Sequence, residues 1–132
     1  MKDTLEEALD AALTPGPVTV ERGGVRATVE VADVDRIGVS IRGLRVAGGQ
    51  RDADRIAEAL APVERFRVVE TAPELGGAVL RSPVRRGEFY EARADGDGVG
   101  LERRRITPGG RESVPFALTR EQLRRVVEGL GS

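Results

Sequence analysis

Three aspartate pairs, each separated by a single residue, are the groups in this sequence whose type and spacing best suit chemistry. They are Asp33 with Asp35, Asp52 with Asp54, and Asp95 with Asp97. Paired carboxylates can hold Mg²⁺ or Ca²⁺, because both cations prefer oxygen ligands. Aspartate is also favoured in turns and at helix N-termini, where its side chain accepts backbone N–H groups. We predict these structural roles for all three pairs, and no metal site.

The segment that begins at Asp95 resembles the start of a calcium-binding loop. Asp95, Asp97 and Gly100 match its first, third and sixth positions. The fifth and twelfth positions hold Val99 and Ile106, which have no side-chain oxygen. The segment also lies between two predicted strands, whereas such a loop lies between two helices. We therefore predict a hairpin turn.

Few side chains in this sequence could act in catalysis. The chain has no cysteine and no histidine, and Lys2 is its only lysine. The usual thiolate nucleophile and the usual proton shuttle near neutral pH are thus missing. Two carboxylates can cleave glycosides without histidine, but the candidates Glu70 and Glu74 have no supporting motif. We expect no catalytic residues and no cofactor, with a carboxylate-dependent enzyme as an alternative.

Arginine accounts for 20 of the 21 basic residues. Its guanidinium group binds carboxylate or phosphate through two parallel hydrogen bonds, so a cluster could form an anion site. The candidates are Arg81, Arg85, Arg86, Arg103 and Arg105. The net charge is −1 and the pI is about 5.6, whereas nucleic-acid-binding domains are usually strongly basic. An Arg-mediated binder of nucleic acid or of a phosphate ligand is therefore only an alternative.

The first 31 residues are predicted to form a helix and a hairpin, followed by a turn at residues 32–36. Leu5, Leu9 and Leu13 share one helix face. Gly23 and Gly24 suit a tight turn in which both central residues have positive φ. Closing the hairpin there pairs charge with opposite charge on one face and apolar with apolar on the other. The pairs are Glu21 with Arg26, Val20 with Ala27, Thr19 with Thr28, and Val18 with Val29.

A third strand and a second helix are predicted next. Ile37, Val39 and Ile41 alternate with small or polar residues, which indicates a strand with one buried face. The helix runs from about residue 52 to residue 61 and ends before Pro62, because the residue before a proline disfavours the helical conformation.

A second hairpin is predicted between residues 88 and 106. Turning at residues 97 and 98 pairs Phe89 with Ile106, whereas turning at residues 95 and 96 pairs Tyr90 with Leu101. The two registers differ by an even shift, so both leave the same side chains on one face. That face, the predicted core face, consists of Tyr90, Ala92, Val99 and Leu101.

The last helix begins at Thr119, which forms a predicted capping box with Gln122. We predict residues 1–132 to be a single α+β domain, with a curved antiparallel sheet of about six to eight strands and three helices on one face. The order of elements is helix, three strands, helix, four or five strands, helix. Short turns between the strands favour antiparallel pairing.

Phe89 and Ile106 are the predicted partner-binding residues. Both lie opposite the core face of their hairpin, so they form an exposed apolar surface unless another element covers them. With little chemistry available, the best functional prediction is a small non-catalytic protein-binding or adaptor domain. Its partner is another protein or a second copy of the chain, as in a homodimer.

The order of elements, the small size and the acidic pI resemble class I type III secretion chaperones. That resemblance implies a dimeric α+β protein that holds effector segments in an extended form. It extends over most of the chain as an order of elements, and the present chain has extra strands between the second and third helices. A chaperone of this kind is therefore a further alternative.

No secretory signal is predicted, since the acidic residues Asp3, Glu6 and Glu7 come early and no apolar stretch follows them. No segment approaches the ~18 apolar residues that a membrane-spanning helix needs. We expect a cytoplasmic protein without a membrane partner.

Overall fold

The computed structural model describes residues 3–72 and 77–132. The described residues form three helices and nine strands. The helices are α1 (Leu5–Ala12), α2 (Ala53–Leu60) and α3 (Arg120–Leu130). The strands are β1 (Gly16–Arg22), β2 (Val25–Val34), β3 (Gly38–Ala47), β4 (Arg67–Ala72), β5 (Gly77–Arg81), β6 (Glu88–Ala94), β7 (Gly98–Thr107), β8 (Gly110–Val114) and β9 (Phe116–Thr119).

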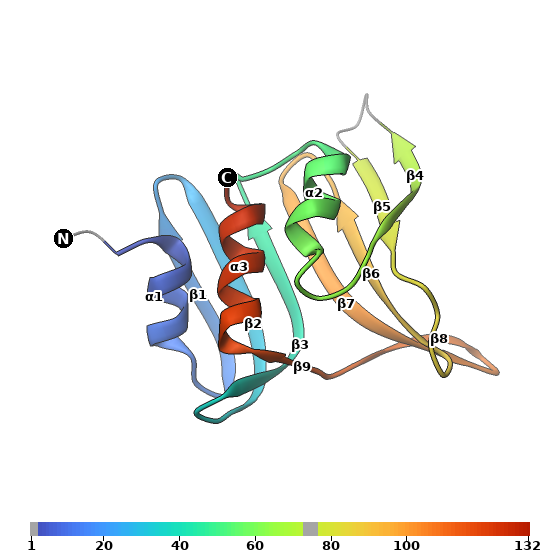
Figure 1. Cartoon of the computed structure of the whole chain (residues 1–132), viewed down its shortest axis with the longest axis horizontal. Coiled ribbons are helices and arrows are strands. Elements are labelled where there is room, and N and C mark those ends of the chain that lie inside the picture. The colour runs from blue at the N-terminus through green and yellow to red at the C-terminus, as the bar shows by residue number, and fades with distance from the viewer. Residues whose placement is uncertain (1–2, 73–76) are drawn as a thin grey trace.

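All nine strands belong to one antiparallel sheet in the order β1-β2-β3-β7-β6-β5-β4. Strand β8 pairs with β7, and β9 pairs with β3. The three helices lie on the same side of this sheet (Figure 1). The predicted α+β class and order of elements are confirmed. Pro115 separates β8 from β9, because proline cannot donate to a ladder.

The first hairpin has the predicted register. Glu21 pairs with Arg26 and Val18 pairs with Val29. Gly23 and Gly24 have φ values of 57° and 80°, which only glycine adopts readily.

Strand β3 contains a bulge that the alternating pattern does not predict. Glu30 pairs with Gly43 and Val31 pairs with Ile41, so Arg42 is the extra residue. The bulge returns Leu44 to the face of Ile41, and both are buried. The expected burial of Ile37 is wrong, because β3 begins one residue later and the Ile37 side chain is 78% exposed.

The second hairpin has a register between the two that the sequence allows. Ala92 pairs with Leu101 and Ala94 pairs with Val99. The turn is closed by Asp95, whose Oδ1 accepts the backbone N–H groups of residues 97 and 98. The observed register is an even shift from both alternatives, so the predicted core face is still correct.

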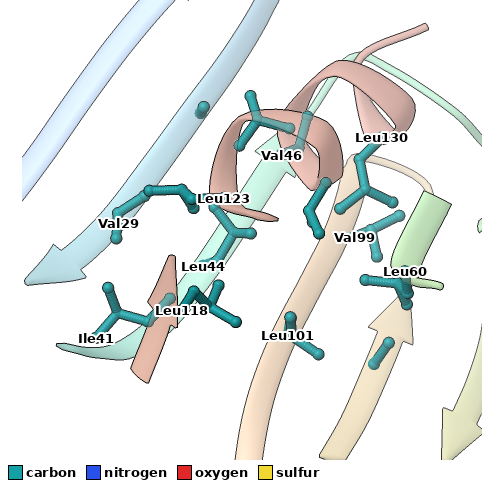
Figure 2. Packing of buried hydrophobic residues seen from close by; sticks show 14 of the residues in the cluster. Val29, Ile41, Leu44, Val46, Leu60, Val99, Leu101, Leu118, Leu123 and Leu130 are labelled. Atoms are coloured by element: carbon teal, nitrogen blue, oxygen red, sulfur yellow. The ribbon is translucent and has the colours of Figure 1, made fainter. Parts of the chain in front are cut away.

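The hydrophobic core lies between the sheet and the three helices (Figure 2). Val29, Leu44 and Leu101 come from neighbouring strands, and Leu60 and Leu123 come from α2 and α3. Each of these side chains is at most 3% exposed. The core therefore occupies only one face of the sheet, and the opposite face has no helix on it within the described residues.

Candidate functional site

The side of the sheet opposite the helices, here called the open face, carries mostly paired charges. Glu21 binds Arg26, and Asp95 binds Arg45, each at 3.0 Å. Arg104 binds Glu102 on the same strand. Exposed pairs of this kind contribute little to stability, but they keep this part of the sheet solvated.

Glu91 is the exception, because its side chain is only 4% exposed. Its two carboxylate oxygens accept hydrogen bonds from Nε of Arg81 at 2.8 Å and Nε of Arg93 at 3.0 Å. Burial by itself raises the pKa of the Glu91 carboxyl, but the hydrogen bonds and charges of the two arginines outweigh burial and hold this pKa below its usual value. Glu91 is thus a fixed carboxylate that positions Arg81.

A groove of about 680 Å³ lies next to Arg81. We call it the arginine groove. Its lining residues are Arg65, Phe66, Arg67, Val69, Arg81, Ser82, Pro83, Val84, Phe89, Ile106 and Arg111. They come from β4 to β8 and the connections at their ends. The groove therefore exists only when this half of the sheet is assembled.

Two local features shape the arginine groove. Val69 is an extra residue in β4, because Val68 pairs with Leu80 and Glu70 pairs with Val79. The bulge leaves Val69 without a strand partner. Beyond β5, the buried Ser82 hydroxyl accepts the backbone N–H of Tyr90 at 2.8 Å. This bond holds the start of the connection that carries Val84.

Phe89 forms part of the groove floor without being exposed. Its side chain is 3% exposed, since the guanidinium groups of Arg111 and Arg81 lie 5.2 and 6.0 Å from the ring centroid. These cation–π contacts orient both arginines over the ring. Ile106 is 50% exposed and Val84 is 56% exposed, so the apolar surface available to a partner comes from the aliphatic residues.

The charge of the groove is of one sign. Among the described residues that line it there are four arginines and no carboxylate. Arg81 is held by Glu91, which itself lies outside the lining. Arg65, Arg67 and Arg111 are exposed, and the groove is therefore a basic, partly apolar surface on a chain of net charge −1.

The predicted partner-binding residues Phe89 and Ile106 both line the arginine groove, together with Arg81 from the predicted anion cluster. The other arginines of that cluster lie elsewhere. Arg85 binds Glu64, and Arg103 and Arg105 both bind Glu88.

Arg86, the remaining member of the predicted cluster, occupies the tight turn before β6 with a φ of 55°. Of the five arginines, Arg81 lines the groove and Arg86 occupies a turn. Arg85 and Arg103 line one small pocket together with Glu64 and Glu88, and Arg105 shares Glu88 with Arg103.

Sequence reasoning missed eight of the eleven residues that line the groove. Arg65 and Arg67 precede the bulge at Val69, and Arg111 comes from a strand that was not expected as a separate element. Val69 and Val84 were the available signal, but nothing in the sequence marks either of them as exposed.

A second depression of about 420 Å³ lies at the centre of the open face, over Gly43 and Gly100. Its walls include Arg45 and Arg93 as well as Glu91 and Glu102. Charges of both signs line it, and Arg45, Arg93, Glu91 and Glu102 are already engaged in ion pairs.

The three aspartate pairs have structural roles. Asp52 caps α2 by accepting the backbone N–H groups of residues 54 and 55. Backbone N–H groups of Gly38 and Ile37 lower the pKa of Asp35, and those of residues 97 and 98 lower the pKa of Asp95. Within residues 3–72 and 77–132, no group of three or more acidic side chains could hold a metal ion. Glu74 lies outside the described residues.

No family model, curated protein or solved structure matches this chain. Among the helices of the described part of the chain, none has the length and apolar character needed to cross a membrane.

Proposed function

We propose that this chain is a non-catalytic binding domain that holds a segment of a partner protein in the arginine groove. One observation carries the proposal. Four large hydrophobic side chains are exposed in the described residues, and three of them, Val69, Val84 and Ile106, line this groove. The fourth, Ile37, lies outside it.

Convergence of these three residues is informative because they come from separate elements. Isolated apolar side chains are common on protein surfaces, but a group of them within one concavity marks an interaction site. Covering each side chain with a partner would contribute on the order of 1 kcal/mol, since each is already partly buried. The surrounding arginine stems add further apolar surface.

The chemistry of the groove supports binding rather than catalysis. Ser82 supplies its only hydroxyl group among the described lining residues. This hydroxyl is buried and engaged with the backbone of residue 90. Arginine remains protonated at all accessible pH values, so it does not act as a general base.

The occupant proposed is a segment of a different protein. Affinity capture from an extract of the source cells tests this with wild type, Ile106→Asp and the matched control Ile37→Asp. Each variant adds one charge at an exposed isoleucine, but only the first changes the groove. A partner retained by wild type and by Ile37→Asp, and lost by Ile106→Asp, supports the proposal.

Two results would overturn it. Equal retention of the partner by both variants would place binding elsewhere on the molecule. Concentration-dependent dimerisation that Ile106→Asp abolishes, with no other protein captured, would make a second copy of the chain the occupant.

A further inference from the structure

We infer that the arginine groove takes an extended acidic segment whose apolar side chains lie between its carboxylates. This inference rests on the proposed function and adds the chemistry of the partner. The described residues that line the groove include four arginines and no carboxylate. The whole chain, in contrast, has a net charge of −1.

The arginines differ in what they can offer a partner. Both carboxylate oxygens of Glu91 are engaged, one of them by Arg81, so that arginine is largely neutralised. Across residues 3–72 and 77–132, the ion pairs of the chain do not include Arg65, Arg67 or Arg111. These three exposed guanidinium groups are available to bind carboxylates through paired hydrogen bonds.

Their positions suggest an occupant that crosses the strands. Arg67 belongs to β4 and Arg111 to β8, and β5, β6 and β7 lie between them in the sheet. Strands are spaced by about 4.8 Å, so the backbones of β4 and β8 are roughly 19 Å apart. The Arg111 guanidinium lies over the Phe89 ring on β6, two strands closer to Arg67. The occupant therefore extends over roughly 10 to 19 Å, which an extended segment covers in about three to six residues. Carboxylates near its two ends would meet Arg67 and Arg111, while apolar side chains between them would meet Val84 and Ile106.

The aromatic residues favour a peptide over a single-stranded nucleic acid. Base stacking needs an accessible ring face. Phe89 and Phe66 are the aromatic residues of the groove, and they are only 3% and 7% exposed. The accessible apolar atoms are aliphatic, which suits leucine-like side chains better than bases.

Labelled peptides of about ten residues, long enough to cross the groove, test the inference by fluorescence anisotropy. One peptide carries aspartates on both sides of two central leucines, and matched peptides carry serine or lysine instead of aspartate. We expect the aspartate peptide to bind at least about tenfold more tightly than the other two, with an affinity that falls as salt rises.

Arg67→Glu and Arg111→Glu should each weaken binding of the aspartate peptide by about tenfold, whereas Arg36→Glu should leave it unchanged. Arg36 is an exposed arginine of the β2–β3 turn and lies outside the groove. The double variant Arg67→Glu/Arg111→Glu should gain affinity for the lysine peptide. This gain cannot come from loss of folding.

If all three peptides bind with equal affinity and only Ile106→Asp weakens their binding, the inference of an acidic occupant is wrong. The proposed function would not be affected by that result. Tighter binding of an oligothymidine than of the aspartate peptide would overturn the inference in favour of nucleic acid. Absence of binding to any peptide would also overturn it, and the capture experiment would then decide the proposed function separately.

Discussion

At the scale of single residues, Glu91 connects the stability of the sheet with the position of the groove. Its buried carboxylate bridges Arg81 and Arg93, and Arg81 in turn covers Phe89. Removing the charge of Glu91 would leave two arginines facing a neutral group. The carboxylate is therefore required for the arrangement of the groove wall, although it does not line the groove itself.

Glu91→Gln should lower the free energy of unfolding by about 1–2 kcal/mol. This loss in the free energy of unfolding is smaller than the loss expected for a fully buried ion pair, because the Arg81 and Arg93 side chains are 32% and 66% exposed. Urea denaturation measures the change. The matched control is Glu102→Gln, an exposed carboxylate on the neighbouring strand, which should change stability by less than about 0.5 kcal/mol. Equal effects of the two variants would contradict this account.

The pH dependence of stability follows from the carboxylates whose pKa is lowered, Asp35, Glu64, Glu91 and Asp95. Such groups bind fewer protons in the folded state, so their contribution is complete above the unfolded pKa of about 4 and is lost as pH falls through the folded pKa. Because the chain has no histidine, the free energy of unfolding should be flat from about pH 5.5 to 7 and fall below about pH 4.5. Urea denaturation across this range tests it, and a decline between pH 7 and 5.5 would contradict it.

At the scale of elements, the pairing of β3 with β7 joins the two halves of the sheet. These strands are distant in the sequence and pair from residues 44–47 to residues 98–101. At Gly98, an added Cβ would press against the backbone of Val46 and Ala47. At Gly100, two residues along the same strand, it would make only ordinary contacts. The pairing of β3 with β7 therefore requires glycine at position 98 but not at position 100.

Gly98→Ala should lower the free energy of unfolding by about 1–3 kcal/mol, because backbone atoms cannot move aside cheaply. Gly100→Ala is the matched control and should be nearly neutral. Thermal denaturation of both variants measures the difference. A neutral Gly98→Ala would mean that the close approach of β3 and β7 does not constrain this position.

The elements also explain what the sequence could predict. The first hairpin was predictable because Gly23 and Gly24 fix the turn and both faces then pair favourably. The register of the second hairpin was not predictable, because Asp95 closes a turn around residues 96 and 97, and neither of the two predicted registers has its turn there. Three bulges, at Ala32, Arg42 and Val69, interrupt the alternation on which strand predictions depend.

The candidate site was predictable only in part for the same reason. Phe89 and Ile106 lie on one hairpin, so local alternation placed them on the face opposite the core. Arg67 and Arg111 reach the groove through strands on either side of that hairpin, and the order of strands in the sheet is not encoded locally. Single-sequence reasoning therefore found the centre of the groove and missed its basic ends.

At the scale of the whole molecule, the chain is asymmetric. Three helices cover one side of the sheet (Figure 1), and the core lies between them and the sheet. The open face carries several ion pairs and, at its β4–β8 end, the arginine groove. The groove is the place where exposed apolar side chains and available arginines coincide, and our central claim is that a partner segment lies there.

Site-specific photo-crosslinking tests that claim most directly. A benzophenone amino acid is introduced at Val84, which is 56% exposed in the groove, and in a control protein at Ile37, which is 78% exposed outside it. Irradiation of the captured complex should link the partner to position 84 and not to position 37. Efficient crosslinking from position 37 with none from position 84 would contradict the account.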